Sequence, residues 1–361
     1  MLPVSRDVKL VSLPGDGVGP EVVGATLGLL DAVGELWDVS FNVEQVEAGG
    51  ARFKRTGTVY TEADFEICRA ADAILLGALG LPDAVLPDGT EAGPDMQFRL
   101  RFDLDLYAGV RPIRRLPGIP GPLRADHPFS FTVIRENTEG LYASRGGGSV
   151  VADRVATDTS VLTAVGVDRV CRFAFEYALA HAPLGGGRPL VTSVDKANVL
   201  RSYAFWRRRF DLVANEYAPR VDAGRMYVDA FCAHLVLAPQ AVHVAVAENM
   251  FGDIVSDLAG ALAGSLGLAP SADIGDAHAV FQSAHGSAPD IAGKGVANPV
   301  ATILSAVMML EWLGLDEVAA DLRQAAETSL ADSNSRTADV GGSAGTQAAA
   351  QAVIAALRGP C

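Results

Sequence analysis

Short apolar runs rich in β-branched residues alternate along this chain with longer stretches of helical spacing, and this alternation limits the fold more than any other feature. The strand-like runs are residues 9–13, 73–77, 131–134, 189–193 and 242–247. A typical helical stretch covers residues 21–36, after Pro20, a residue suited to a first helical turn. Strands that alternate with helices indicate an α/β protein with a largely parallel sheet. In such sheets, ligands bind beyond the carboxyl ends of the strands.

Length and charge narrow the possibilities further. A chain of 361 residues is long enough for two lobes. Its net charge of −14 argues against nucleic-acid partners, which require a basic surface. The N-terminus lacks a signal-peptide pattern, and apolar runs such as residues 301–310 are too short to span a membrane. The cysteines, which share no metal-binding spacing and suit a reducing compartment, are Cys68, Cys171, Cys232 and Cys361. We therefore expect a cytoplasmic protein with no membrane contact.

Two segments are rich in small residues. Residues 140–151 contain three consecutive glycines and are either a disordered linker or an arm that reaches a partner subunit. Residues 341–357 are rich in alanine and glycine and predict a helix of small residues.

Four arginines, Arg99, Arg101, Arg111 and Arg135, lie in or next to strand-like, helical or loop segments. Planar guanidinium groups bind carboxylates through two parallel hydrogen bonds, so several of them together suit a di- or tricarboxylate. Each one alone could equally be a surface arginine. Arg111 follows an apolar strand, however, and a buried arginine needs a partner.

Three aspartates suit a divalent cation. Asp253 and Asp257 are four residues apart near the start of a predicted helix, so they share one face, and Asp229 is the third. Carboxylate oxygens are the ligands that Mg²⁺ and Mn²⁺ prefer. The competing interpretation is that acids in a first helical turn merely complement the helix dipole.

Lys196 and Tyr142 are candidates for acid–base chemistry. Lys196 follows a buried strand, and a lysine that is buried or near other cations can act as a base. Tyr142 follows Arg135 by seven residues and could donate a proton. Surface and interface roles are the alternatives for the lysine and the tyrosine, respectively.

Residues 285–299 (HGSAPDIAGKGVANP) form a loop of small residues and prolines, which suits close contact with a flat ligand. An acid in such a loop, here Asp290, can accept hydrogen bonds from a ribose and reject a 2′-phosphate. The glycines at positions 15, 17 and 19 do not match the dinucleotide fingerprint, because the third glycine comes one residue early and no acid follows at the usual distance.

Five motifs together resemble the β-decarboxylating dehydrogenases, which act on isopropylmalate, isocitrate, homoisocitrate, and tartrate or D-malate. They are, in order, residues 15–22 (GDGVGPEV), 106–112 (LYAGVRP), 195–200 (DKANVL), 249–257 (NMFGDIVSD) and 285–299. The likeness extends from about residue 8 to about residue 312, and the last two motifs are too long for chance agreement.

The resemblance implies a role for each candidate. Arg101, Arg111 and Arg135 would hold the substrate carboxylates, with Asn198 and Val199 also at the substrate. Asp253 and Asp257 would bind the metal together with Asp229 of the partner subunit. Lys196, also from the partner subunit, would take the hydroxyl proton, and Tyr142 would protonate the product of decarboxylation. The residues implied to bind NAD are His285, Gly286, Ser287, Ala288, Asp290, Ile291 and Asn298.

The resemblance also implies an isopropylmalate-dehydrogenase-like α/β fold with two domains, parallel or mixed sheet cores and an intersubunit clasp. The large cofactor domain would comprise residues 1–106 and 265–361, and the small dimerisation domain residues 107–264, with a clasp arm at about 140–160. Because Lys196 and Asp229 would cross the interface, the smallest active unit would be a homodimer, and a tetramer is also open.

The sequence departs from the family pattern at three places. Gly109 stands where asparagine is usual, residues 281–284 (FQSA) replace Phe-Glu-Pro-Val, and Leu81 replaces glycine or aspartate. The first two concern the region where the resemblance puts the nicotinamide.

The C3 substituent of the substrate is read in this family by the helix before Arg101. Asp95, Gln97 and Arg99 in that helix indicate a polar or charged substituent. We therefore expect an NAD- and Mg²⁺- or Mn²⁺-dependent dehydrogenase for homoisocitrate, isocitrate or an unusual malate. Isopropylmalate or tartrate/D-malate dehydrogenase is the alternative, and a non-catalytic regulatory subunit is the alternative of another class.

Overall fold

The computed structural model describes residues 7–123 and 128–359. Contacts between Cα atoms divide the chain into two compact units. Unit 1 comprises Met1–Asp105, Gly118–Pro120 and Gly264–Cys361, and unit 2 comprises Leu106–Pro117 and Gly121–Ala263. The N-terminal residues 1–6 and Cys361 lie outside the described residues.

Unit 1 contains strands at both ends of its sequence, in the order β2-β1-β3-β12-β11. Its strands are β1 (Asp7–Leu13), β2 (Ser40–Gln45), β3 (Ala73–Leu76), β11 (Pro270–Ile274) and β12 (Ala279–Ser283). β11 and β12 are antiparallel, and the other pairs are parallel. The predicted strand at residues 73–77 is β3, whose four residues are all buried, as expected of a strand covered on both faces.

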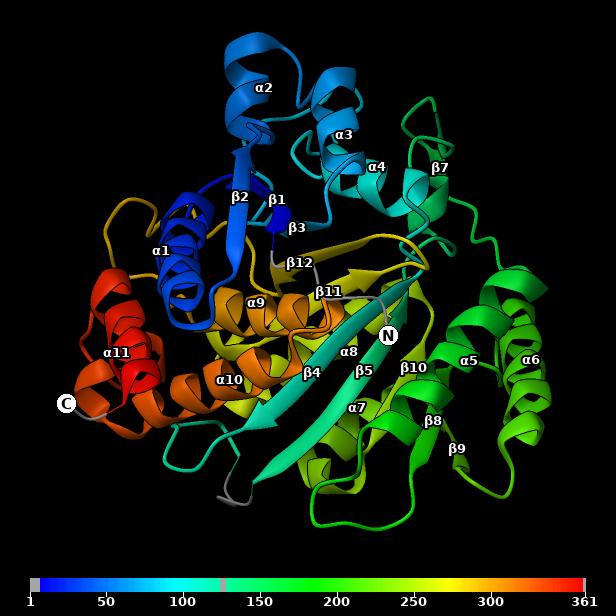
Figure 1. Cartoon of the computed structure of the whole chain (residues 1–361). Helices are drawn as coiled ribbons and strands as arrows, with labels where there is room; N and C mark the ends of the chain where they lie inside the picture. The colour runs from blue at the N-terminus through cyan, green and yellow to red at the C-terminus, as the bar shows by residue number, and fades with distance from the viewer. Residues whose placement is uncertain (1–6, 124–127, 360–361) are drawn as a thin grey trace. The chain divides into compact units, whose positions relative to one another are not determined.

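The helices of unit 1 are α1 (Gly19–Trp37), α2 (Gly50–Thr56), α3 (Glu62–Arg69), α4 (Asp95–Asp103), α9 (Val300–Trp312), α10 (Asp316–Ala331) and α11 (Thr346–Arg358). α1, α9, α10 and α11 pack together, and α9 lies on β11 and β12 (Figure 1). Pro20 lies in the first turn of α1, as predicted. The predicted small-residue helix near the C-terminus is α11, and its alanines allow close packing on α1 and α10.

Unit 2 has the strand order β4-β5-β10-β8-β9. The strands are β4 (Ala108–Arg115), β5 (Phe129–Glu136), β8 (Leu190–Asp195), β9 (Asp222–Tyr227) and β10 (Val244–Ala247), and its helices are α5 (Ala164–Ala180), α6 (Arg201–Tyr217), α7 (Val228–Leu237) and α8 (Asn249–Ala263). β4 runs antiparallel to β5, and the remaining pairs are parallel. α8 packs on β4 and β5, whereas α5 packs on β5, β8 and β10.

The register of unit 2 brings three loops to one edge of its sheet. Ala247 of β10 pairs with Arg135 of β5 on one side and with Val194 of β8 on the other. The loops that follow these strands therefore start side by side, at the carboxyl ends where ligands of α/β sheets bind.

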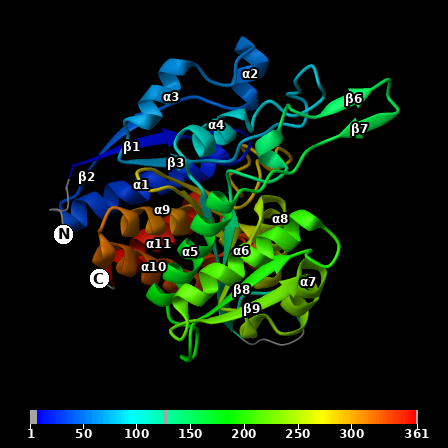
Figure 2. The ribbon, with the colours of Figure 1, turned by 90° about the vertical axis from the view of Figure 1, so that its right-hand side faces the viewer.

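The glycine-rich segment after Tyr142 forms a hairpin rather than a disordered linker. Its strands are β6 (Ser149–Val151) and β7 (Val155–Thr157), which pair antiparallel and are fully exposed. Figure 2 shows this arm extending away from α5 and α6 of the same unit.

Two physical properties of the chain follow from the same coordinates. Within residues 7–123 and 128–359, no helix has both the length and the apolar character needed to cross a membrane. Cys68 and Cys171 are buried and Cys232 is partly buried. Burial raises the pKa of the Cys68 thiol to about 12, so this cysteine is an unreactive core residue.

Candidate active site

The two aspartates predicted to bind metal lie on α8, directly after the buried strand β10. The helix begins at Asn249, so Asp253 and Asp257 lie beyond its first turn. The alternative explanation, that they complement the helix dipole, is therefore wrong, because that effect fades within the first turn. Gly252 lets the helix approach β5 closely, since a Cβ there would lie 2.8 Å from the Cβ of Arg135.

Arg135 connects this helix to the loop that carries Tyr142. Its Nη1 pairs with Asp253, and its Nε and Nη2 donate to Asn249 Oδ1 at 3.1 and 2.9 Å. The Tyr142 hydroxyl donates to the other oxygen of Asp253 at 3.3 Å. The guanidinium also lies 5.6 Å from the centre of the Tyr142 ring. Three predicted site residues are thus brought into direct contact.

The surroundings of Asp257 disfavour an isolated charge on its carboxyl group. Burial, and then the neighbouring charge of Asp253, raise the pKa of this carboxyl, while Arg111 and Arg135 act in the opposite direction. Both arginines are buried. Two adjacent carboxylates in such a setting suit a divalent cation. Among the described residues, no group of three acidic, histidine or cysteine side chains lies close enough together to hold a metal.

Glu136, which the sequence interpretation overlooked, organises the loop that delivers Tyr142. This fully buried carboxylate accepts hydrogen bonds from the Thr138 amide and hydroxyl, at 2.9 and 2.6 Å, and from the Glu139 amide at 2.6 Å. Burial raises the pKa of Glu136 to about 7. The loop amides are thereby satisfied inside the protein, and Tyr142 is held near α8. The run Glu-Asn-Thr-Glu is a pattern in which local side-chain-to-backbone bonds are common, and it could have signalled this role.

Tyr142 is suited to donate a proton. Burial raises the pKa of its phenol, and so does the charge of Asp253. The group therefore stays neutral and keeps its proton at physiological pH.

Lys196 and Asp229, the two residues that the family resemblance assigns to the partner subunit, form a separate group within unit 2. Lys196 Nζ lies 2.6 Å from Asp229 Oδ1, and this lysine lowers the pKa of the aspartate. Asp195, the residue before Lys196, accepts two hydrogen bonds from Arg207, at 2.7 and 2.9 Å, and these fix the start of the loop that carries Lys196. Among the described residues, neither member of the Lys196–Asp229 pair bonds to Asp253 of the same chain. The adjoining Asn198 and Val199 are exposed.

The departure at Gly109 has a local explanation. Gly109 pairs with Arg135 across β4 and β5. A Cβ at this position would lie 2.8 Å from Asn137 Oδ1, so the Asn137 side chain occupies the space that a larger residue would need. The absence of a side chain at position 109 therefore leaves room for the asparagine side chain at position 137.

In unit 1, the two arginines of α4 have different surroundings. Arg101 is buried, and its Nε donates to Asp273 Oδ2 of β11 at 2.8 Å. Arg99 donates to Glu62 on α3, at 3.0 and 3.2 Å, pairs with Asp103 and lies over the Phe65 ring. Its guanidinium thus contributes to packing α4 against α3, a role that the sequence did not indicate. Asp95 and Gln97, on the same helix, are partly buried.

The loop predicted to bind the adenosine borders a hollow of about 460 Å³ in unit 1, which His285, Gly286, Ala288, Ile291 and Asn298 help to line. His285 Nδ1 lies 2.9 Å from the Gly286 carbonyl oxygen, which fits a protonated Nδ1. Burial lowers the pKa of this imidazole, so it stays neutral. Its buried Nε2 has no hydrogen-bond partner among the described residues and can accept a bond from a ligand. Ser287 is buried, whereas Asp290 is exposed.

Glu21 fixes the far end of that loop, and the sequence interpretation overlooked it. Its carboxylate accepts from the Gly295 amide at 3.2 Å, from the Ala297 amide at 3.0 Å and from the Thr346 hydroxyl. Thr346 also donates to the Ala297 carbonyl at 2.6 Å. The start of α1 and the start of α11 therefore hold the loop together.

The glycine turn before α1 is fixed by hydrogen bonds to other parts of unit 1. The Asp16 amide donates to Ala78 O, and the Val18 amide donates to Ser287 O at 2.8 Å. A Cβ on Gly17 would lie 1.8 Å from the same Ser287 oxygen. These amides have protein partners and are not left for a phosphate, in agreement with the absence of a dinucleotide fingerprint here.

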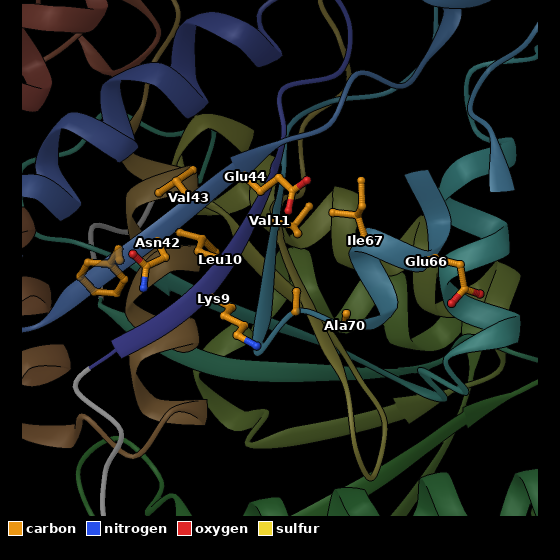
Figure 3. A pocket seen from close by; sticks show the side chains of 11 residues that line it. Lys9, Leu10, Val11, Asn42, Val43, Glu44, Glu66, Ile67 and Ala70 are labelled. Carbon is orange, nitrogen blue, oxygen red and sulfur yellow. The ribbon is translucent and has the colours of Figure 1, made fainter. Parts of the chain in front are cut away.

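A larger hollow in unit 1 is separate from these residues. It lies between β1, β2 and α3 and is lined by Lys9, Phe41, Asn42, Glu44 and Ile67, among others (Figure 3). None of the residues predicted for the active site lines it. The larger hollow is therefore separate from the residues that the sequence predicted for the site.

Comparisons with known proteins agree with this geometry. The model of the isocitrate/isopropylmalate dehydrogenase family matches residues 9–357. A 3-isopropylmalate dehydrogenase from Leifsonia xyli is 42% identical over 335 residues, covering 91% of this chain and 92% of that protein. A probable tartrate dehydrogenase/decarboxylase from Agrobacterium vitis is 39% identical over 363 residues, covering 98% and 99%.

The fold agrees with a solved structure as well. The isocitrate dehydrogenase from Methylococcus capsulatus superposes with a TM-score of 0.87 at 34% sequence identity, covering 97% of this chain and 99% of that one. Enzymes of this family generally use a nicotinamide dinucleotide and a divalent metal. The chain belongs to the isocitrate/isopropylmalate dehydrogenase family and is an oxidatively decarboxylating hydroxy-acid dehydrogenase.

Proposed function

We propose that this enzyme oxidises and decarboxylates a 3-substituted malate, with NAD as the oxidant, Mg²⁺ or Mn²⁺ as the metal and a homodimer as the smallest active unit. The contact of Arg135 and Tyr142 with Asp253, next to Asp257, is the observation that supports this best. It combines a carboxylate-binding cation, a proton donor and two metal-binding oxygens in one place.

Each group of site residues has its own role in the proposed reaction. Arg101, Arg111 and Arg135 bind the carboxylates of the substrate. Asp253 and Asp257 hold the metal with Asp229 of the partner subunit. When bound, the divalent cation polarises the substrate oxygens and stabilises negative charge on them, and NAD supplies the hydride acceptor.

Two side chains handle the protons. With its amine in the neutral form, Lys196 of the partner subunit accepts the proton of the substrate hydroxyl, and its contact with Asp229 keeps the two partner residues together. After carbon dioxide leaves, Tyr142 gives its proton to the carbon that has lost the carboxylate. Its raised pKa favours this role because the phenol remains protonated.

Several exposed apolar side chains of unit 2 support the dimer. Leu237 at the end of α7 is 81% exposed and Ile254 on α8 is 54% exposed. Val199, beside Lys196, is 66% exposed. Large apolar side chains that are exposed beside site residues, as Ile254 is beside Asp253 and Val199 near Lys196, are typical of a subunit interface.

NAD rather than NADP is the proposed oxidant because Asp290 stands in the adenosine loop. A carboxylate there favours a ribose 2′-hydroxyl and repels a 2′-phosphate. His285, Gly286, Ser287, Ala288, Ile291 and Asn298 would contact the adenosine half of the cofactor.

Purified protein with Mg²⁺ or Mn²⁺ and a panel of malates tests the proposal through the absorbance of NADH and the release of carbon dioxide. The panel contains isopropylmalate, tartrate, D-malate, isocitrate and homoisocitrate, each with NAD and with NADP. We expect turnover with NAD on at least one of them. No reduced cofactor with any of these substrates would refute the proposal.

A regulatory subunit without catalysis is the alternative from another class. It predicts no metal binding at α8, so Mn²⁺ titration followed by electron paramagnetic resonance separates the two. The dehydrogenase predicts a Mn²⁺ site that the double variant Asp253→Asn/Asp257→Asn lacks.

A further inference from the structure

Glu248, the last residue before α8, carries a buried carboxylate that is unfavourable for folding. Its side chain is 0% exposed, and its Oε2 accepts a hydrogen bond from the Tyr203 hydroxyl at 2.8 Å. Among the described residues, Glu248 Oε1 has no hydrogen-bond partner. A buried carboxylate loses its hydration and needs several donors to offset that loss, and here a single phenol supplies the hydrogen bond. Such a group needs an explanation other than stability.

Tyr203 connects this carboxylate to the loop that carries Lys196. Tyr203 lies in the first turn of α6. The amides of Val199 and Leu200 donate to the Lys196 carbonyl oxygen at 3.0 and 3.1 Å, so the main chain runs from Lys196 into α6 through a hydrogen-bonded turn. The Tyr203 ring also stacks on Phe251 in the first turn of α8, with the ring centres 4.7 Å apart. The position of Tyr203 therefore helps to fix that of Lys196.

The other carboxylate oxygen of Glu248 faces the loop that carries Tyr142. A Cβ on Gly140, two residues before Tyr142, would lie 2.0 Å from Glu248 Oε1, so this loop rests directly on the carboxylate. The residue after Glu248 binds the same loop, because Asn249 Nδ2 donates to the Glu139 carbonyl oxygen at 3.2 Å. Glu248 therefore lies where the loop of Tyr142, the start of α6 and the start of α8 meet.

The phenol of Tyr203 is a lasting donor to this junction. Burial, and then the charge of Glu248, raise the pKa of Tyr203, so the hydroxyl keeps its proton at physiological pH. Another contact of α6 holds the helix on β8, since Trp206 Nε1 donates to Ser193 Oγ at 3.1 Å. The contact of Tyr203 reaches further, to the residue that precedes α8.

We infer that Glu248 and Tyr203 are positioning residues for proton transfer, because their bond holds the loop of Lys196 and the Glu248 carboxylate supports the loop of Tyr142. This inference rests on the proposed function, in which each chain supplies Tyr142 to its own site and Lys196 to the site of the partner subunit. Both residues act through these loops. Since proton transfer requires close approach of donor and acceptor, a small displacement of either loop should slow turnover without weakening metal binding.

The double substitution Tyr203→Phe/Glu248→Met tests the inference, because it removes both polar partners and keeps the side chains close to their original size. Replacing a buried polar pair by apolar groups of similar shape is nearly neutral for stability, so the melting temperature should not fall. We expect kcat to fall about tenfold or more, since misplaced catalytic groups can cost about 10²-fold in rate. The solvent deuterium isotope effect on kcat should rise, because proton transfer then limits turnover.

Binding should be spared in the same variant. We expect the KM for NAD and the affinity for Mn²⁺ to change less than about twofold, because a displaced proton donor or acceptor affects the chemical step. Glu248→Gln should retain most of the wild-type kcat, since its amide oxygen still accepts a hydrogen bond from Tyr203.

Tyr217→Phe is the matched control, because this buried phenol at the last residue of α6 also interacts with a carboxylate, that of Glu176. The control should leave kcat and the isotope effect unchanged. If the double variant does not fold, Tyr203→Phe alone replaces it and is compared with Glu248→Gln, and circular dichroism verifies folding.

The outcomes separate the inference from the proposed function. A wild-type enzyme that turns over a malate, with a folded double variant whose kcat and isotope effect are unchanged, refutes the inference alone. A variant whose kcat falls together with its melting temperature, at an unchanged isotope effect, also refutes the inference, because the pair would then be purely structural. A wild type inactive on every malate refutes the proposed function itself.

Discussion

The residues around α8 in unit 2 and the predicted adenosine loop in unit 1 are held in place by different kinds of contact. Around α8, Arg135 of β5, Tyr142 of the following loop and Asp253 of the helix contact one another, and burial together with the charge of Asp253 raises the pKa of Asp257. The adenosine loop consists mainly of small residues held through their backbone by Glu21, Val18 and Thr346. Chemistry at a metal depends on the identity of side chains, whereas recognition of a flat cofactor depends on the course of the backbone. Substitutions in the two regions should therefore affect different kinetic constants.

The largest effect is expected at the metal-binding helix. Asp253→Asn removes a proposed metal ligand and the partner of both Arg135 and Tyr142. We expect kcat/KM to fall roughly 10³-fold, since several kcal/mol of charge stabilisation would be lost. Steady-state kinetics at saturating Mn²⁺ measures this. Asp211→Asn, which breaks an exposed pair with Arg225, is the control, and a loss of similar size there would contradict the assignment.

Protonation of Glu136 should make the free energy of unfolding depend on pH. Its pKa rises from 4.5 to about 7 on folding, so the folded protein binds a proton that the unfolded chain has released. The free energy of unfolding should therefore fall as the pH rises from 4.5 to 7, by up to about 3 kcal/mol from this group. Glu136→Gln should remove that slope.

Urea unfolding at several pH values measures the slope, with the exposed Glu66→Gln as the control. Parallel pH curves for wild type and Glu136→Gln would mean that the carboxyl is ionised normally in the folded protein.

A smaller and more selective effect is expected at the adenosine loop. Glu21→Gln weakens the bonds to the Gly295 and Ala297 amides and so loosens the loop. We expect the KM for NAD to rise about tenfold, while kcat changes less than twofold, since a lost charge-assisted bond contributes about 1.5–3 kcal/mol. Initial rates at varied NAD concentrations measure the two constants. A fall in kcat that matched the rise in KM would remove the distinction between the two regions.

Much of the fold and the site could be predicted because the signals are local. The strand at residues 73–77, the helix after Pro20 and the spacing of Asp253 and Asp257 all follow from short-range periodicity. The roles of the remaining site residues came from the family resemblance, whose motifs are six to fifteen residues long. The alternative that Asp253 and Asp257 complement a helix dipole was wrong because α8 begins at Asn249, a few residues earlier than that alternative requires.

The sequence by itself determined the alternation of strands and helices, the two aspartates on one helical face and the family. Only the tertiary structure decided how charges are matched: Arg101 with Asp273, Arg99 with Glu62, and Glu136 and Glu21 with loop amides. The reason is physical. Periodicity reports which face of an element is buried, but the partner of a buried charge comes from wherever the fold brings a chain segment within about 3 Å, and that distance has no counterpart in sequence spacing.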